Sequence, residues 1–389
     1  MLMDGAPLIV IDARLVTDAP SGIGVYTSRM LSLIPALAPD LRFHALFRTK
    51  ELLGATLADA LPPNLSAEVV PYGPFSPKSQ LLLPLLVRRL GASILHTPNF
   101  IMPYLMGCGR CKVVSNIHDI IPLAVADYAP NSRTSRLRAI YRMCIRLAIS
   151  RSATVITGSQ AAKDDIVRIF SLCDGKASRL RVIHDGADAP SSPASHTPVK
   201  DASDTTSERL VIYVGRMDPY KNVPMLVEAF DKVRRRLPFP VRLKVIGPKD
   251  PRYPEAETLA RTLGAPVEFT GFVTDAELDE AYRTADLLAH PSKYEGFGLQ
   301  LVEAMAAGTP VLCTDGGSQP EVAGDAARIT PSGDASAFAA AMEEILLSPA
   351  VQGELRAKGA ERARLFTWDA TARSTLAIYR GILADGGAR

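Results

Sequence analysis

The feature that most constrains the fold of this chain is the regular alternation of short apolar, β-branched runs with segments of helical periodicity. Continuous apolar runs separated by helices are typical of parallel strands that are covered on both faces. In the first half, the predicted strands are Leu8–Ile11, Phe43–Phe47, Glu68–Val70, Ile94–His96, Val113–Ile117, Thr154–Thr157 and Val182–His184. In the second half, they are Leu210–Val214, Leu243–Ile246, Val267–Thr270, Leu287–Ala289, Val311–Cys313 and Ala327–Ile329. The pattern predicts an α/β fold with doubly wound sheets.

The two series of strands are separated by a stretch with the composition of a linker. Residues 187–208 are rich in Ser, Pro, Thr and Asp and have no apolar periodicity. A chain of 389 residues is long enough for two domains, with a ligand cleft between them. The predicted parts are a Rossmann-like domain at 1–188, a linker at 189–208, a second such domain at 209–367, and a last helix within 368–389 that packs back toward the first domain.

Composition and cysteine usage exclude several classes of protein. The formal net charge of +3 is too small to indicate nucleic-acid binding. The sequence contains no run of about 20 uncharged apolar residues, so no membrane-spanning helix is predicted. The N-terminus lacks the features of a signal peptide and the five cysteines are scattered, so we expect a cytoplasmic protein. Cys108 and Cys111 form a lone C-x-x-C without a second pair, and no metal site is predicted.

A phosphate-binding segment is predicted where the strand Leu210–Val214 ends. The strand runs straight into Gly215, which lets the chain turn, and then into Arg216 and Lys221 before a helix predicted at Val223–Leu237. The planar fork of an arginine and the compact charge of a lysine can hold a diphosphate without a metal ion. The alternative is that both cations are solvated in a loop.

The segment Glu295–Glu303, EGFGLQLVE, combines two carboxylates with the start of a helix. Free N–H groups near Gly298 and Leu299, together with the helix dipole, favour an anion there. An ionised glutamate is a pure hydrogen-bond acceptor, so hydroxyl groups are its natural target beside that anion. We therefore predict that Glu295 binds sugar hydroxyls on one side of a diphosphate and that Glu303 binds ribose hydroxyls on the other. The alternative makes Glu303 a solvated helix residue and Glu295 a loop charge.

This segment resembles the E-x7-E element of retaining GT-B glycosyltransferases, specifically glycosyltransferase family 4. Gly215-Arg216 with Lys221 resembles the diphosphate clamp of that family, and the similarity continues in order through residues 308–311, GTPV, and 316–321, GGSQPE. The resemblance covers most of the second domain and implies a GT-B architecture of two Rossmann-like domains facing each other across a cleft. It also implies a nucleotide-sugar donor on the second domain, an acceptor on the first, and no further cofactor.

The first domain carries two further elements that fit the resemblance. Gly22 and Gly24, in the sequence SGIGVY, open a predicted helix as the donor-side glycine loop of the family does. Thr27 occupies the third glycine position and no strand directly precedes the loop, so it is not a dinucleotide-binding fingerprint. The strand Val113–Ile117 leads into His118, which in similar enzymes sits by the reacting carbon and contacts the donor sugar. The alternative is a structural histidine.

Both elements look most similar to bacterial mannosyltransferase-like members of the family. This similarity implies GDP-mannose as the donor, with UDP-sugars as the second choice. Val25 stands where an arginine is familiar and Gln300 where a proline is common, and both departures leave the clamp intact. The implied acceptor is a glycan or a lipid-diphosphate-linked sugar in polysaccharide or glycolipid synthesis.

The resemblance implies a mechanism without a protein base, and we expect no metal ion because no DxD-like pair stands at a predicted cleft loop. The leaving phosphate takes the proton of the acceptor, Arg216 and Lys221 stabilise the diphosphate charge, and His118 and Glu295 hold the sugar. One alternative is a nucleotide-sugar epimerase of the same architecture, which needs no acceptor. The other is a non-catalytic nucleotide-sugar-binding protein. Transfer of label from donor to acceptor separates these three.

Residues 133–151 contain six arginines and no acidic residue. A helical stripe predicted to be core is formed by Leu137, Ile140, Tyr141, Cys144, Ile145 and Ala148. A basic row on its flank is formed by Arg138, Arg142 and Arg146. An apolar segment at residues 79–89 also ends in two basic residues, Arg88 and Arg89. The interpretations are a solvated helix face, or contact of the first domain with an anionic cytoplasmic membrane surface, which would make the protein peripheral.

Overall fold

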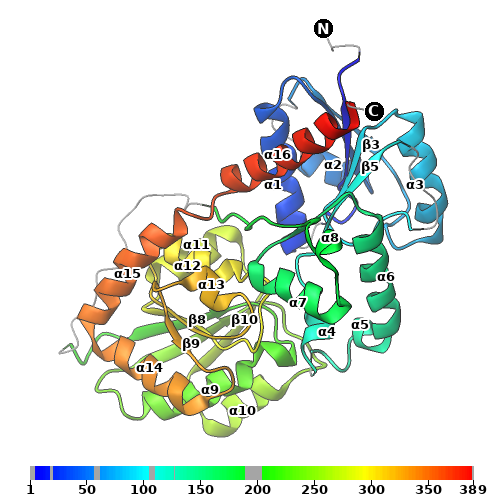
Figure 1. Cartoon of the computed structure of the whole chain (residues 1–389). Helices are drawn as coiled ribbons and strands as arrows, with labels where there is room; N and C mark the ends of the chain where they lie inside the picture. Colours follow the sequence, from blue (N-terminus) through cyan, green and yellow to red (C-terminus); the bar gives the residue numbers. More distant parts are fainter. Residues whose placement is uncertain are drawn as a thin grey trace.

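The computed structural model describes residues 5–17, 21–56, 62–104, 110–126, 128–188 and 204–387. These residues form two parallel β-sheets, each with helices on both faces (Figure 1). The first sheet has seven strands in the order β3-β2-β1-β4-β5-β6-β7, and the second has six in the order β10-β9-β8-β11-β12-β13. The strand order reverses between β1 and β4 and between β8 and β11. In doubly wound sheets such reversals open a crevice at the carboxyl ends of the strands.

The strands of both sheets lie close to the apolar runs of the sequence. The first sheet consists of β1 (Leu8–Asp12), β2 (Arg42–Phe47), β3 (Leu65–Val69), β4 (Ile94–Thr97), β5 (Lys112–Asn116), β6 (Thr154–Thr157) and β7 (Leu180–Val182). The second consists of β8 (Arg209–Val214), β9 (Val241–Ile246), β10 (Val267–Gly271), β11 (Leu287–His290), β12 (Val311–Thr314) and β13 (Arg328–Thr330). The predicted α/β class with two doubly wound units is confirmed.

Helices lie between most of the strands, and three helices follow the last strand. In the first half they are α1 (Gly22–Leu37), α2 (Lys50–Thr56), α3 (Pro77–Arg89), α4 (Ile121–Ala124), α5 (Arg133–Arg136), α6 (Arg138–Arg151), α7 (Gln160–Phe170) and α8 (Asp174–Ala177). In the second half they are the 3-10 helix η1 (Pro219–Lys221), α9 (Val223–Arg234), α10 (Glu255–Leu263), α11 (Asp275–Thr284), α12 (Leu299–Ala306), α13 (Gln319–Ala323), α14 (Ala335–Leu347), α15 (Pro349–Ala363) and α16 (Trp368–Gly387).

Two predictions about the first half are wrong in detail. The edge strands β3 and β7 begin three and two residues earlier than predicted, because edge strands are partly exposed and their polar residues hide the pattern. The apolar stripe predicted as core on residues 133–151 is split. A break at Leu137 separates α5 from α6, and only the C-terminal part of the stripe, Ile145 and Ala148, is buried. Leu137 and Ile140 are exposed instead.

The last helix, α16, packs against the first half of the chain. Trp368, Leu376 and Tyr379 belong to the same buried cluster as residues of β1 and α1, and Figure 1 shows α16 lying beside α1. The Tyr379 hydroxyl also lies in hydrogen-bond contact with the buried His96 of β4. The other domain boundaries stay predictions, and residues 189–203 of the predicted linker lie outside the described residues.

The two halves touch at several points along their facing edges. Ser159 donates a hydrogen bond to the Gly296 carbonyl at 2.7 Å, and the rings of Tyr128 and Tyr220 stack with centroids 5.3 Å apart. The Glu321 carboxylate accepts bonds from the first two N–H groups of α7 and from His184. Glu321 belongs to the GGSQPE segment, so one part of that motif ties the second half to the first.

Candidate active site

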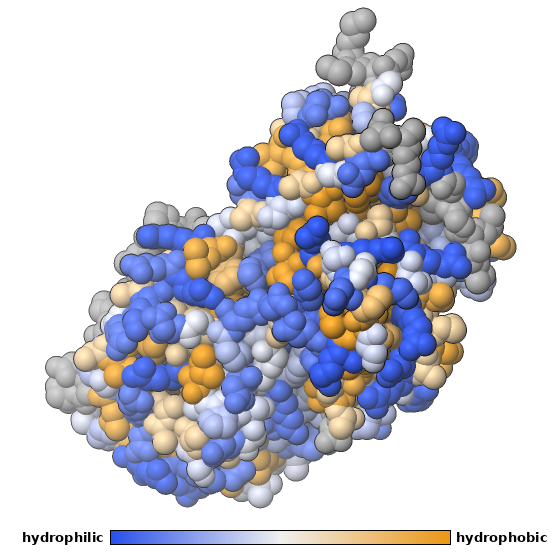
Figure 2. All heavy atoms as spheres, viewed as in Figure 1, coloured by the Kyte–Doolittle hydropathy of each residue, from blue (hydrophilic) through white to orange (hydrophobic). Residues whose placement is uncertain are grey.

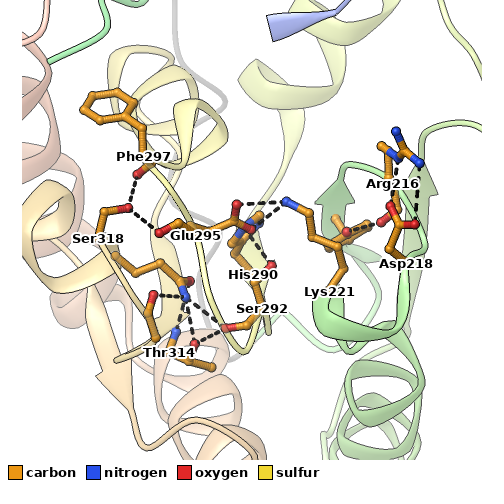
Figure 3. A network of polar contacts seen from close by, with 12 residues as sticks. Arg216, Asp218, Lys221, His290, Ser292, Glu295, Phe297, Thr314 and Ser318 are labelled. Atoms are coloured by element: carbon orange, nitrogen blue, oxygen red, sulfur yellow. Dashed lines mark hydrogen bonds and ion pairs between the residues drawn. The ribbon is translucent and has the colours of Figure 1, made fainter. Parts of the chain in front are cut away.

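The candidate site is centred on Glu295, in the loop between β11 and α12. Its carboxylate accepts hydrogen bonds from the Lys221 ammonium at 2.6 Å and 2.9 Å, and it lies 2.8 Å from Nε2 of His290 (Figure 3). Lys221 ends η1, which follows β8, and His290 is the last residue of β11. The side chains of Lys221 and Glu295 are 9% and 7% exposed. The strand ends therefore bring these two sequence-predicted residues together as a buried ion pair.

The Glu295 carboxylate is held in its charged form. Burial alone raises its pKa, but the Lys221 charge and the contact with His290 outweigh burial and hold the pKa of Glu295 well below its ordinary range. An ionised carboxylate accepts hydrogen bonds and donates none. At neutral pH, Glu295 can therefore hold a hydroxyl group but cannot act as a proton donor.

Arg216 lies in the same loop and is far more open than Lys221. Its Nε is 2.8 Å from the Asp218 carboxylate, and its side chain is 61% exposed. The turn that presents it needs glycine. Gly215 has a φ of +148°, and a Cβ on Gly247 would lie 2.0 Å from the Gly215 carbonyl oxygen. The loops after β8 and β9 are thus in backbone contact, which fixes the place from which Arg216 extends.

The GGSQ segment at residues 316–319 holds the loop of Glu295 in place. A Cβ on Gly317 would lie 2.3 Å from the Glu295 carbonyl oxygen, so the two backbones approach as only glycine allows. The Ser318 hydroxyl contacts the carbonyls of Glu295 and Phe297, at 3.1 Å and 2.9 Å. The Gln319 amide donates to the Ser292 carbonyl at 2.9 Å. This part of the predicted motif positions the carboxylate without touching it.

The predicted anion site lies at the start of α12. Gly298 precedes the helix with a φ of +89°, and Leu299 is its first residue. The first N–H groups of a helix have no partner within it and point out along its axis. Further along, Glu303 accepts a hydrogen bond of 2.7 Å from the Tyr282 hydroxyl. Burial raises the pKa of Glu303, and this effect is larger than the lowering of the same pKa by the hydrogen bond from Tyr282. One oxygen of Glu303 is thus held by the protein.

His118 follows β5 on the opposite side of the site. Its Nε2 lies 3.2 Å from the Pro98 carbonyl, a group that can only accept a hydrogen bond. Its Nδ1 faces the Asp185 carboxylate at 3.9 Å. The Tyr26 ring packs edge-on against the imidazole with centroids 5.2 Å apart. Burial raises the pKa of Asp185, against the opposing effects of the His118 and His184 charges. These contacts fix the ring plane of His118.

The glycine loop of the first half lies close to His118. Ser21 caps α1 by accepting a hydrogen bond of 3.1 Å from the Gly24 N–H, and Gly22 is the first residue of the helix. Ile23, between the two glycines, lines the same cavity as His118. This cavity has a volume of about 640 Å³ and receives side chains from both halves, including Asp119 and Tyr220. The structure thus brings the predicted glycine loop and histidine to one cavity.

Sequence reasoning missed several residues of the site. His290, Asp218 and Tyr282 pair with the predicted residues, and Asp185 faces His118. In the sequence, His290 and Asp185 were marked only by their position at the end of a predicted strand. The same signal led to the prediction of His118. Asp218 and Tyr282 gave no such signal, because their partners are set by the tertiary fold.

Other predicted features can be placed briefly. Among the described residues, no group of three or more His, Cys, Asp and Glu side chains is arranged to hold a metal ion. Within the same residues, no helix combines the length and hydropathy needed to cross a membrane. Cys108 lies outside the described residues, and Cys111 is buried.

Comparisons with known proteins agree with this architecture. One family model, Glycosyltransferase Family 4, matches residues 23–189, and another, Glycosyl transferases group 1, matches residues 199–366. The chain is 27% identical over 301 residues to the O-antigen chain mannosyltransferase B of Escherichia coli, covering 74% of each chain. It is 30% identical over 236 residues to the MMP alpha-(1->4)-mannosyltransferase of Mycolicibacterium hassiacum, covering 59% of this chain and 54% of the relative. Several other curated relatives are matched over only about half their length.

A solved structure shows the same fold over the whole chain. Sucrose-phosphate synthase from Thermosynechococcus elongatus is similar with a TM-score of 0.74 at 23% identity, over 98% of this chain and 100% of that chain. Two doubly wound sheets, each in a half that a glycosyltransferase family model matches, form the GT-B architecture. The chain belongs to the family 4 glycosyltransferases, and its second half is of the group 1 type.

Proposed function

We propose that the protein is a retaining hexosyltransferase that moves an α-mannosyl group from GDP-mannose to a glycan or lipid-linked oligosaccharide. The observation that carries the proposal is the contact between the Glu295 loop and the His118 segment. A Cβ on Gly296 would lie 2.6 Å from Cβ of Asp119, so a sugar beside Glu295 would also lie beside His118. UDP-sugars are the second choice of donor. Two relatives named as mannosyltransferases support mannose.

The donor diphosphate would lie between Arg216, Lys221 and the start of α12. Lys221 is paired with Glu295, so the diphosphate shares the lysine with that carboxylate. Arg216 is exposed enough to turn from Asp218 toward the ligand. These groups stabilise the negative charge that grows on the diphosphate as the glycosidic bond breaks. On the far side of the diphosphate, the Glu303 carboxylate would accept a hydrogen bond from a ribose hydroxyl.

Transfer then needs no protein base. The bond between the anomeric carbon and the diphosphate oxygen breaks, and the acceptor oxygen bonds to the same face of that carbon. The acceptor proton passes to the departing phosphate oxygen. Glu295 and His118 hold the sugar during this step, and Glu295 is neither the acid nor the nucleophile of a glycosidase pair. The product keeps the α configuration of the donor, and an inverted product by NMR would overturn the retaining assignment.

We also propose that activity needs no metal ion, because two cationic side chains already face the diphosphate. Turnover in excess EDTA should equal turnover with added Mg²⁺. Complete loss of activity with the chelator would contradict this part of the proposal.

A donor panel tests the reaction itself. GDP-mannose labelled in the sugar should deliver the label to an acceptor, and nucleotide release should be highest with this donor. An epimerase of the same fold would release a free altered sugar without an acceptor. A non-catalytic binding protein would be stabilised by nucleotide but release none. The presence of both glutamates and both cations argues against the non-catalytic alternative, and label transfer to an acceptor decides between a transferase and an epimerase.

Peripheral contact of the first half with an anionic cytoplasmic membrane surface is a further part of the proposal. All three arginines of the basic row are exposed, and Arg138 and Arg142 also donate hydrogen bonds to the carbonyls of Leu123 and Ile169. Near such a surface each basic residue contributes roughly 1 kcal/mol, reduced by salt. Co-sedimentation with anionic vesicles should be strong at low salt and weak at high salt. Vesicle binding that does not depend on lipid charge would favour the alternative, a solvated helix face.

A further inference from the structure

Helix α7 of the first half begins against the loop that carries Glu295. Its N-cap residue, Ser159, is buried, and the hydroxyl makes two hydrogen bonds. It accepts the Ala162 N–H at 3.0 Å, which caps the helix, and it donates to the Gly296 carbonyl at 2.7 Å. Only a group that both accepts and donates, such as a hydroxyl, can make this pair of bonds. Ser159 therefore joins the start of α7 to the residue next to Glu295.

The second half also supplies the negative charge at the start of α7. The first turn of α7 contains no acidic residue of its own. Instead, the Glu321 carboxylate of α13 accepts the N–H groups of Gln160 at 2.8 Å and Ala161 at 3.1 Å. These N–H groups have no partner within a helix, and the helix dipole also favours a carboxylate there. Figure 1 shows α7 and α13 next to each other at the boundary between the halves, and in Figure 2 the surfaces of the two halves meet there without a gap.

The Glu321 carboxylate is held in its charged form. Its Oε1 also lies 2.8 Å from Nε2 of His184, and the Glu321 side chain is 25% exposed. Burial raises the pKa of Glu321, but His184 and the N–H groups of α7 outweigh burial and hold this pKa below its ordinary range. The contact between Glu321 and α7 is therefore charge-assisted at neutral pH, and such hydrogen bonds are stronger than neutral ones.

The segment that contacts α7 also holds the Glu295 loop from the other side. Ser318, three residues before Glu321, contacts the Glu295 carbonyl at 3.1 Å. A further bond runs directly from the loop to α7, because the Tyr294 hydroxyl donates to the Asp165 carboxylate. The Glu295 loop is thus fixed between α13 and α7, so its place relative to the first half depends on α7.

The segments that lead out of the first half and back into it lie beside this contact. The Ala187 N–H donates to the Phe366 carbonyl at 3.0 Å, and the Thr371 hydroxyl donates to the His184 carbonyl at 2.8 Å. The Phe297 ring lies against the rings of His184 and Phe366, with centroids 6.0 Å and 5.6 Å away. The α7 contact therefore belongs to the junction that sets how the two halves are oriented.

We infer that Ser159 and Glu321 are positioning residues, which dock the start of α7 on the Glu295 loop and so set the place of Glu295 relative to His118. The inference rests on the proposed function, in which the donor sugar lies between Glu295 and His118. Both residues act through the loop and not by contact with the substrate. Gly296 is the meeting point, because it follows Glu295 and its carbonyl binds Ser159. A shift of about 1 Å in a group that holds the substrate can cost about a hundredfold in rate.

Steady-state kinetics with labelled GDP-mannose test the inference. Ser159→Ala and Glu321→Gln should each lower kcat about tenfold, because the Glu295 loop loses a docking contact. KM for GDP-mannose should stay within about twofold of the wild-type value, since Arg216, Lys221 and the start of α12 all belong to the second half. The double variant should lose less than the product of the two single losses, because both substitutions act on one contact.

Ser348→Ala and Glu68→Gln are the matched controls. Ser348 is an N-cap serine like Ser159, but it caps α15 within the second half. Glu68 contacts a histidine like Glu321 does, but it lies 3.4 Å from His44 within the first half. Both controls leave the α7 contact intact, so their kcat should equal that of the wild type. A fall in kcat no larger in Ser159→Ala than in Ser348→Ala, or a loss carried by KM alone, would overturn the inference.

Hydrogen exchange, measured without any substrate, separates this inference from the proposed function. The amides of Gln160 and Ala161 should exchange slowly in the wild type, because both are bonded to Glu321. Tyr294→Phe removes a bond that reaches α7 from the second half, so it should speed their exchange about tenfold. Ser348→Ala should leave their exchange unchanged. Equal exchange in the wild type and Tyr294→Phe would count against the docking of α7 and overturn the inference.

The two measurements together tell the possible failures apart. The expected exchange pattern in a protein that turns over no donor would support the docking of α7 and sink the proposed function. Label transfer to an acceptor, with normal kcat in Ser159→Ala and Glu321→Gln, would sink the inference and leave the transferase standing.

Discussion

Replacing Lys221 by methionine should destabilise the protein itself, apart from any effect on catalysis. The substitution keeps the apolar stem of Lys221 but leaves the Glu295 carboxylate buried without its ionic partner. At the observed 2.6 Å and an effective dielectric constant of about 20, two unit charges attract by about 6 kcal/mol. The desolvation of both groups opposes this attraction, and removal of one partner of a buried pair typically costs about 3–5 kcal/mol. Because His290 still contacts Glu295, we expect about 3 kcal/mol.

Urea unfolding followed by circular dichroism measures this loss. Lys232→Met is the matched control, since Lys232 also pairs with a glutamate at 2.7 Å but on the surface, with side chains 44% and 51% exposed. It should cost no more than about 0.5 kcal/mol. The double variant Lys221→Met with Glu295→Gln should recover much of the stability, because no charge is then left buried. Lys221→Met as stable as the wild type, or a double variant no better than the single one, would refute the reasoning.

The same pair gives the stability a pH dependence. The pKa of Glu295 is lowered in the folded protein, so the contribution of this group is present above its ordinary pKa of 4.5 and is lost as pH falls below that value. The stability gap between the wild type and Lys221→Met should therefore be constant near neutral pH and narrow in acid. A gap that widened as the pH fell would contradict the assignment.

Three further predictions concern the rest of the site. Arg216→Ala should lower kcat/KM by about 2–4 kcal/mol of transition-state stabilisation with little loss of folding stability, which kinetics and thermal unfolding together would show. Gly317→Ala should destabilise by more than the roughly 1–2 kcal/mol of a left-handed residue, because its Cβ meets backbone. Gly264→Ala is the control, because Gly264 has a φ of +58° and its Cβ would meet open space. This variant should show only the conformational cost of a left-handed residue. Asp185→Asn should lower kcat without weakening nucleotide binding, because His118 would lose the carboxylate that faces its Nδ1; an unchanged kcat would contradict a role of Asp185 in positioning His118.

The sequence predicted the elements of this molecule better than their contacts. Apolar runs locate parallel strands well, because both faces of such a strand are buried, and β8 was predicted to within one residue. The residues at strand ends were singled out by the same logic, and their functional roles stay predictions. Which of them pair was not predictable, since Lys221 and Glu295 are 74 positions apart and meet only through the order of β8 and β11 in the sheet. Helical periodicity likewise showed that Leu137 and Ile140 share a face but not that this face lines a cavity.

The pairing of Lys221 with Glu295 also explains how a phosphate site can keep a glutamate beside it. In this structure the lysine charge is already neutralised, so the donor must share a cation that the protein itself uses. A sugar hydroxyl can donate a hydrogen bond to Glu295 and so replace part of its contact with Lys221. A bare nucleoside diphosphate has no hydroxyl at that position. Glu295→Gln removes the competing carboxylate and should therefore reduce turnover while binding GDP at least as tightly as the wild type. Glu303→Gln, which changes the ribose contact, should weaken GDP binding, and calorimetry with both variants makes the comparison. If Glu295→Gln abolished GDP binding while turnover stayed normal, the placement of Glu295 at the sugar would be wrong.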